Sequence, residues 1–246
     1  MNSGHCKRIC LWSGPRNVST AVLYAFDQRD DTVAVDEPLY GHYLSTSRAD
    51  HPGAEKILPL LEHDGAKVIR ETVLGPCEKP VLFLKLMAHH LPGLDRTFMD
   101  QTSNVILTRN PREVLATLRF QVKNPTMADA GYDQQVALLE RYPAMPVLDA
   151  KQLLLNPEAV LRELCDRLSL PFDEAMLTWP EGPKACDGPW APYWYHNVHK
   201  SRGFAPFQPS AKIMPAELEP LLEECQPLYE TLLERAIRAP DLESTQ

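Results

Sequence analysis

Two glycine patterns that mark common nucleotide-binding enzymes are missing from this 246-residue sequence. It contains no Gly-x-x-x-x-Gly-Lys-Ser/Thr loop, which argues against a nucleoside triphosphatase, and no Gly-x-Gly-x-x-Gly after a predicted strand, which argues against a dinucleotide-dependent enzyme. A His-Glu-x-x-His pattern is also missing, and His196 and His199 have no cysteine beside them. We therefore expect no metal site.

Cysteine pairs and long apolar runs are missing as well. The six cysteines are scattered without a Cys-x-x-Cys pair, as is typical of reduced intracellular thiols. No apolar run approaches the roughly 20 residues that cross a bilayer, and the N-terminus has neither the charged start nor the apolar core of a signal peptide. These features predict a cytoplasmic protein with no membrane partner.

Positive charge is in deficit, because 25 lysines and arginines face 33 acidic residues and the formal net charge is −8. Such a chain has no broad electrostatic attraction for nucleic acid, so we expect no nucleic-acid partner. An anionic ligand would need a local cluster of basic groups. The length and the 44% apolar content fit one domain over residues 1–246, whose oligomeric state the sequence leaves open.

The stretch Lys7–Gln28 predicts a strand, a tight loop and a helix. It opens with an apolar run, a Gly-Pro pair breaks the run, and Ser19 and Thr20 are residue types that begin helices. A loop that joins a strand to a helix gathers free backbone N–H groups at the positive end of the helix dipole, an arrangement that holds phosphate. Arg16 adds a positive charge. An ordinary strand-to-helix connection with polar surface residues is the alternative.

Strands and helices alternate along the first two thirds of the chain, which predicts a mainly parallel sheet with helices on both faces, an α/β fold of the P-loop nucleoside-phosphate-binding type. Further strands are expected at residues 32–35, 80–87, 104–108 and 145–149, and helices after Pro111 and at 132–141 and 157–168. An irregular functional segment rich in proline and aromatics covers about 179–210, and closing helices follow at 215–238.

Charged and polar residues follow several of these strands. Asp36 and Glu37 end the second strand, His89 and His90 follow the third, and Arg109 follows the fourth. The carboxyl ends of parallel strands share one edge of the sheet, where open α/β sheets bind ligands. We therefore expect these residues to meet the first loop at one site.

Several of these segments together resemble the sulfotransferase family, whose members use 3′-phosphoadenosine 5′-phosphosulfate (PAPS) as sulfuryl donor. The loop Pro15-Arg16-Asn17-Val18-Ser19-Thr20 is similar to the family's 5′-phosphosulfate loop. The corner Arg109-Asn110-Pro111, with Thr117 eight positions after Arg109, resembles the 3′-phosphate motif. Lys200-Ser201-Arg202-Gly203 resembles, more loosely, the basic loop that closes over the same phosphate. Residues 149–176 are similar to the family's late strand and helix.

The resemblance implies sulfuryl transfer from PAPS to a hydroxyl or amine of a small-molecule acceptor, without a metal. Arg16 would stabilise charge on the leaving oxygens. A base must take the acceptor's proton, and Glu37 is the first candidate because some members of the family use a glutamate. His89 or His90 is the second, since other members use a histidine. Asp36 is a lesser candidate, because its side chain should alternate away from Glu37 along the strand.

Two rival functions stay open at this point. A phosphotransferase with a related loop would bind ATP without preferring a 3′-phosphate. A nucleotide-binding protein without catalysis is the other, because Val18 stands where the family loop often has glycine, and a β-branched residue tolerates positive φ poorly. The aromatic run of the irregular segment, Trp190, Tyr193, Trp194 and Tyr195, is a candidate cover for adenine. Tyr40, His42, Tyr43 and the polar segment at 45–60 are candidates for the acceptor pocket.

Overall fold

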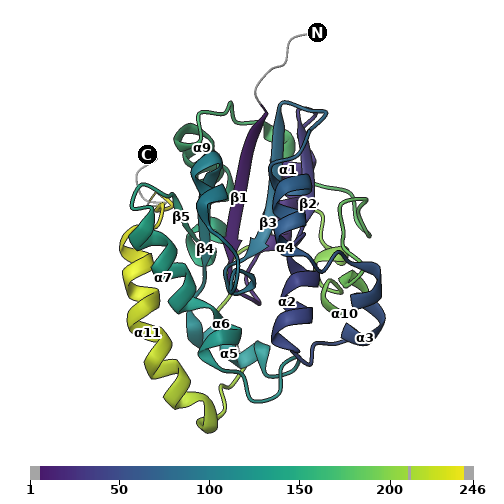
Figure 1. The fold of residues 1–246 in the computed structure, drawn as a ribbon. Coiled ribbons are helices and arrows are strands. Elements are labelled where there is room, and N and C mark those ends of the chain that lie inside the picture. Colours follow the sequence, from purple (N-terminus) through teal and green to yellow (C-terminus); the bar gives the residue numbers. More distant parts are fainter. Residues whose placement is uncertain (1–5, 210–211, 241–246) are drawn as a thin grey trace.

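The computed structural model describes residues 6–209 and 212–240, so Ser210 and the two ends of the predicted domain lie outside it. Five parallel strands form one sheet in the order β2-β3-β1-β4-β5, as Figure 1 shows. The strands are β1 Lys7–Ser13, β2 Thr32–Asp36, β3 Val81–Met87, β4 Ser103–Thr108 and β5 Val147–Asp149. The predicted mainly parallel α/β fold is confirmed.

Helices cover both faces of this sheet, as predicted (Figure 1). Alternate residues of β1 point to opposite faces, so Ile9 and Leu11 pack in one core and Cys10 and Trp12 in the other. The first core includes residues of α1 Ser19–Asp27 and α9 Pro157–Arg167. The second includes residues of α7 Tyr132–Arg141 and α11 Glu219–Glu234. Two buried faces explain why β1 is apolar from Ile9 to Trp12 and why β3 is apolar except at Lys85.

The segment between β2 and β3 is more helical than the sequence indicates. It contains α2 Tyr40–Ser47, α3 Ala54–Ile57, α4 Gly65–Val68 and a π-helical turn, Ile69–Val73. Residues 45–60 contain the end of α2, all of α3 and a 3-10 turn at Leu58–Leu60, so they are not the continuous loop that their polar composition predicts. The turn that follows α4 is held by Arg8, whose guanidinium donates to the carbonyls of Val73, Leu74 and Gly75.

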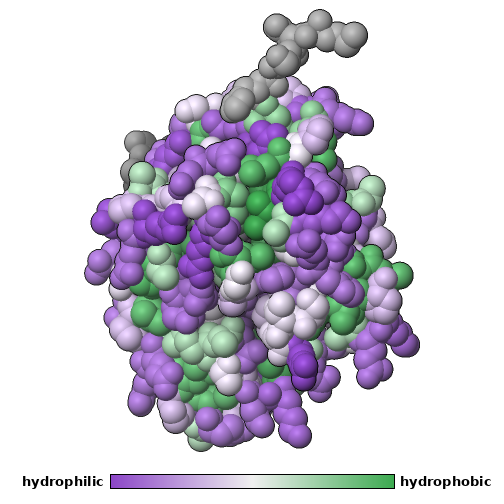
Figure 2. Space-filling view, viewed as in Figure 1, coloured by the Kyte–Doolittle hydropathy of each residue, from purple (hydrophilic) through white to green (hydrophobic). Residues whose placement is uncertain are grey.

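The remaining helices are short and connect the strands to the C-terminal part. They are α5 Pro111–Leu118, α6 Met127–Ala130, α8 Ala150–Leu155 and α10 Ala191–Trp194. The expected irregular segment is mostly without regular structure, but it includes α10 and one antiparallel bridge between Thr178 and Gly203. No helix among residues 6–209 and 212–240 is long and apolar enough to cross a membrane. Polar residues predominate on the surface in Figure 2, with apolar patches between them.

Candidate functional site

The loop between β1 and α1 is shaped by Asn17. Its Nδ2 donates to the Leu107 carbonyl of β4 at 3.1 Å, and its Oδ1 accepts from the Ser19 N–H at 3.0 Å. Arg16 takes the left-handed conformation that the turn needs, with φ 56°. Val18 has φ −89°, so it carries no positive-φ strain. The loop therefore opens onto the N-terminus of α1, as expected for an anion site.

Two arginines meet beside this loop, although 93 positions separate them in the chain. Arg109 Nη1 donates to the Arg16 carbonyl at 3.0 Å, and Arg109 Nε pairs with Glu113 at 2.8 Å. Arg16 Nε is buried without a hydrogen-bond partner in the described residues. Burial, and then the positive charge of Arg109, lower the pKa of Arg16. Two neighbouring cations with a single carboxylate paired to one of them form a site that an anion would complete.

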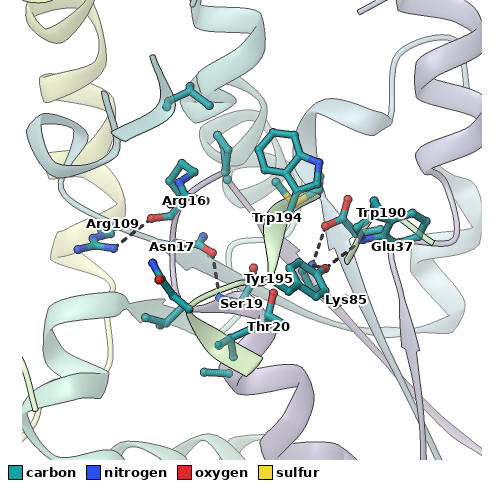
Figure 3. Close-up of a pocket in the computed structure, with 18 of the residues that line it drawn as sticks. Arg16, Asn17, Ser19, Thr20, Glu37, Lys85, Arg109, Trp190, Trp194 and Tyr195 are labelled. Atoms are coloured by element: carbon teal, nitrogen blue, oxygen red, sulfur yellow. Dashed lines mark hydrogen bonds and ion pairs between the residues drawn. The ribbon is translucent and has the colours of Figure 1, made fainter. Parts of the chain in front are cut away.

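A cavity of about 360 Å³ joins this loop to the ends of β2 and β3. Figure 3 shows Arg16 and Arg109 toward one side and Glu37, Lys85 and Trp190 toward the other. The predicted site residues that line the cavity are Pro15, Arg16, Asn17, Val18, Ser19, Thr20, Glu37, His89, His90, Arg109, Ser201 and Gly203. The structure thus brings most of the residues chosen from the sequence to one hollow.

Three of the residues predicted to bind the donor do not line that cavity. The Thr117 hydroxyl donates to the Val114 carbonyl of its own helix at 2.9 Å. Arg202 is exposed and pairs with Glu181, and Lys200 is exposed. The Ser201 hydroxyl is already engaged, since it accepts from the Trp179 indole at 3.0 Å and donates to Val198. The two basic residues of the 200–203 loop, Lys200 and Arg202, therefore face away from the cavity.

Lys85 organises the far end of the cavity. Its Nζ lies 2.6 Å from Glu37 Oε1, 2.9 Å from Asp36 Oδ1 and 2.6 Å from the Tyr195 hydroxyl. Burial disfavours the charged amine, but the negative charges of Asp36 and Glu37 outweigh burial and raise the pKa of Lys85 well above its ordinary value. For Glu37 burial is the larger effect and raises the pKa, although Lys85 opposes it. A carboxylate whose pKa is raised accepts a proton more readily than an ordinary glutamate does.

Asp36 is the structural partner in this group. Its side chain is fully buried, and besides Lys85 it accepts from the Tyr195 hydroxyl at 2.7 Å and the Trp190 indole at 3.1 Å. The expectation that Asp36 points away from Glu37 was wrong, because both carboxylates bind one amine. The reason is local: Glu37 has φ 34°, so strand alternation stops at Asp36.

His89 and His90 are buried, and each has an Nδ1 without a partner in the described residues. Burial lowers the pKa of His89 to about 3, although the negative charge of Asp129 opposes it. Burial also lowers the pKa of His90 well below the ordinary value, and the positive charge of Lys85 adds to this effect. Both imidazoles are therefore neutral at physiological pH. They pack edge to face with ring centroids 4.7 Å apart, and His90 stacks on Tyr43 at 4.5 Å.

Sequence reasoning missed the role of Lys85 and of the aromatic run. Trp190 and Tyr195 use their polar groups on Asp36 and line the Glu37 side of the cavity, so they are not free to lie over a ring beside Arg109. The signal that could have identified Lys85 is that it is the single charged residue within an otherwise apolar strand. Among the described residues no cluster of three His, Cys, Asp or Glu side chains could hold a metal ion. His199 pairs instead with Asp187 at 3.0 Å.

Comparisons with known proteins extend over nearly the whole chain. Residues 7–236 match the family model described as "Sulfotransferase domain". Two proteins of Arabidopsis thaliana, branched-chain-amino-acid aminotransferase-like proteins 2 and 1, are 38% and 37% identical over 91% and 90% of this chain. The chain spans only 41% and 40% of their length.

Solved structures support the same fold. The sulfotransferase from Alicyclobacillus acidocaldarius superposes with a TM-score of 0.55 at 11% identity, over 95% of this chain and 98% of that one. The sulfotransferase domain of the curacin biosynthetic pathway gives 0.52 at 16% identity, over 94% and 99%. These likenesses concern the fold, while the family match covers the sequence itself. The chain therefore belongs to the sulfotransferase domain family.

Proposed function

We propose that the protein transfers the sulfuryl group of PAPS to a hydroxyl or amine of a small-molecule acceptor. The observation that supports this most directly is the meeting of the loop 14–20 with Arg109 at one cavity, where Arg109 Nη1 lies 3.0 Å from the Arg16 carbonyl. Two basic anchors from distant parts of the chain can then hold the two phosphorylated ends of one nucleotide. Family membership supplies the reaction class.

The donor fits the chemistry of the arginine side. The loop N–H groups, the hydroxyls of Ser19 and Thr20 and the unpartnered Nε of Arg16 would hold the 5′-phosphosulfate. Arg109 would bind the 3′-phosphate through Nη2, which has no partner among the described residues. The apolar residues Leu118, Val122, Leu154 and Phe204 also line the cavity and suit an adenine ring. A bound dianion would relieve the repulsion between the two guanidinium groups.

The transfer itself needs a base and a stabilised leaving group. The acceptor oxygen or nitrogen attacks sulfur as the bond from sulfur to the phosphate oxygen breaks, which releases adenosine 3′,5′-bisphosphate. The acceptor proton goes to Glu37, and the charge that grows on the phosphate oxygen is stabilised by Arg16 and the loop N–H groups. His89 and His90 are the alternative bases, because both are neutral and line the same cavity.

Calorimetry with adenosine 3′,5′-bisphosphate tests the donor site. We expect the wild type to bind it and Arg109→Ala to bind it at least about tenfold more weakly, the effect of losing a charge-assisted hydrogen bond. Arg112→Ala is the matched control, since Arg112 lies on the same helix but is exposed and pairs with Glu219. Equal affinity of wild type and Arg109→Ala would overturn the assignment.

The same assay separates the rival functions. ATP bound as tightly as the bisphosphate would favour a phosphotransferase, although the loop has no lysine for the phosphates. Bisphosphate binding without sulfate transfer from radiolabelled PAPS to any component of a metabolite extract would favour a protein that has kept the nucleotide site and lost the chemistry.

A further inference from the structure

The part of the cavity away from the arginines differs from the donor side in charge and in composition. We call it the acceptor end; it is lined by Glu37, Tyr40, His51, Lys85, His89, His90, Asp129, Trp190, Trp194 and Tyr195. In Figure 3 Trp190 and Lys85 lie with Glu37, away from Arg109. This end should decide which acceptor the protein takes.

Negative charge is in excess at the acceptor end. Asp36, buried behind the cavity, neutralises Lys85 at 2.9 Å, so the second carboxylate on that amine, Glu37, is unbalanced. Glu37 Oε2 has no hydrogen-bond partner among the described residues, since Lys85 donates to Oε1. Asp129 adds another carboxylate. Its Oδ2 caps α6 through Thr126, while its Oδ1 makes no hydrogen bond in the described part of the chain.

The histidines do not offset this excess. Burial lowers the pKa of His51, His89 and His90, so all three rings are neutral at physiological pH. The rings of His89 and His90 line the cavity, and their Nδ1 atoms, which are themselves buried, lack partners among the described residues. A neutral imidazole nitrogen accepts a hydrogen bond from an N–H donor.

Aromatic rings meet at steep angles around the same space. Tyr40 and Trp190 have centroids 5.0 Å apart at 79°, and His51 and Trp194 have centroids 5.6 Å apart at 66°. Rings arranged in this way present π faces from more than one direction, the geometry that stabilises a desolvated cation. Excess carboxylate and π faces act in the same direction, because both favour positive charge and disfavour an anion.

We propose that the acceptor is a small amino alcohol or aminophenol, whose cationic nitrogen lies against the Trp194, His51 and Asp129 side while its hydroxyl points to Glu37. The proposal rests on the function proposed above and names its substrate class. The hydroxyl proton passes to Glu37, the oxygen–sulfur bond forms and the bond to the phosphate oxygen breaks, so the ammonium group takes no part in the reaction. The cavity of about 360 Å³ must hold the donor as well, so the space left at the acceptor end suits a small acceptor.

Calorimetry tests the proposal. The wild type is saturated with adenosine 3′,5′-bisphosphate and titrated with small hydroxyl compounds of similar shape that differ mainly in charge. Tyramine is compared with 4-propylphenol and with 3-(4-hydroxyphenyl)propionate, and choline with 3,3-dimethylbutan-1-ol. We expect at least one cation to bind about tenfold or more tightly than its neutral isostere, and the anion to bind most weakly. If neither cation is preferred over its isostere, or if the anion binds best, the proposal is wrong.

Two variants assign the preference to these residues. Asp129→Asn and Trp194→Leu should each reduce the ratio of cation to isostere affinity severalfold. Asp133→Asn removes the same charge at an exposed position of the neighbouring helix and should leave the ratio unchanged. A ratio that Asp129→Asn and Asp133→Asn lower equally would indicate a general charge effect and contradict the site. If the wild type does not bind the bisphosphate at all, the donor assignment is wrong instead. Failure of the proposed acceptor class and failure of the proposed donor site are therefore distinguishable.

Discussion

At the residue scale, the Glu37 carboxylate has the chemistry of a general base. We expect Glu37→Gln to keep its affinity for adenosine 3′,5′-bisphosphate and to lose about a hundredfold or more in turnover with radiolabelled PAPS, because an amide cannot take the proton. The base works when it is deprotonated. Since burial raises the pKa of Glu37, the fall in wild-type turnover on acidification should begin above the ordinary glutamate value of about 4.3.

Glu62→Gln is the control for this substitution. Glu62 also pairs with a lysine at 2.6 Å, but the pair is on the surface. The variant should turn over like the wild type. Unchanged turnover in Glu37→Gln would move the role of base to His89 or His90, and a pH profile that starts to fall only below the ordinary carboxylate range would also contradict Glu37.

Single residues show where sequence reasoning stops. The types and positions of Arg16, Arg109 and Glu37 could be read from strand ends, because parallel strands bring those ends to one edge. Their partners could not be read: Asp36 and Glu37 share Lys85 only because Glu37 leaves the strand with a positive φ. No local pattern encodes that backbone angle in a glutamate, so the sequence predicted opposite directions for the two carboxylates.

At the element scale, the loop before α1 is held by one amide. Asn17 joins β4 to the first turn of α1 through two hydrogen bonds and carries no charge. We expect Asn17→Ala to weaken binding of adenosine 3′,5′-bisphosphate about tenfold in calorimetry, because the loop N–H groups lose their fixed direction while every cation remains.

Asn156→Ala separates this effect from a general loss of stability. The Asn156 side chain also caps a helix, accepting from the Ala159 N–H at 3.1 Å, but it begins α9 and does not line the cavity. Its loss should lower the melting temperature, as losing a cap does, and leave nucleotide affinity unchanged. Equal weakening by both variants would show that the loop needs no anchor from Asn17.

Elements with strong periodicity were predicted closely, and weak ones were not. The helix expected at 132–141 is α7, Tyr132–Arg141, because its apolar residues fall on one face. The segment at 45–60 reads as polar, yet it contains the end of α2 and all of α3. Tyr40, Tyr43 and Leu44 of α2 and Ile57 of α3 pack with Trp190 and Tyr195 from the irregular segment. These contacts join residues more than 130 positions apart in the chain and override the local composition, so a local pattern in the sequence cannot predict them.

At the scale of the whole molecule, the sheet order β2-β3-β1-β4-β5 is what brings the site together. The loop after central β1 stands between the ends of β3 and β4, so Arg109 reaches it from one side and Lys85 from the other. Alternating strands and helices predict a parallel sheet but leave its order open, since several orders satisfy right-handed crossovers. The strand order could therefore not be predicted from the sequence and is seen only in the structure.

The folded protein as a whole should be sensitive to acid because of its buried histidines. Burial, with a smaller contribution from the positive charge of Lys85, keeps His90 neutral, while an unfolded histidine takes up a proton below about pH 6.5. A depressed folded pKa gives stability that is present above the unfolded value and is lost as pH falls. Each such histidine should cost roughly 1.4 kcal/mol of unfolding free energy per pH unit below that point.

His90→Phe should therefore flatten the dependence of unfolding free energy on pH in denaturant titrations. Phenylalanine keeps a ring between Tyr40 and Tyr43, which stack on His90 at 5.4 and 4.5 Å, but takes up no proton in either state. Relative to its own value at neutral pH, the variant should lose roughly 2 kcal/mol less than the wild type at about pH 5. His63→Phe, at an exposed position, should follow the wild type. Parallel curves for His90→Phe and wild type would mean that His90 gains its proton in the folded state as readily as in the unfolded one, and the buried neutral pair would then be excluded.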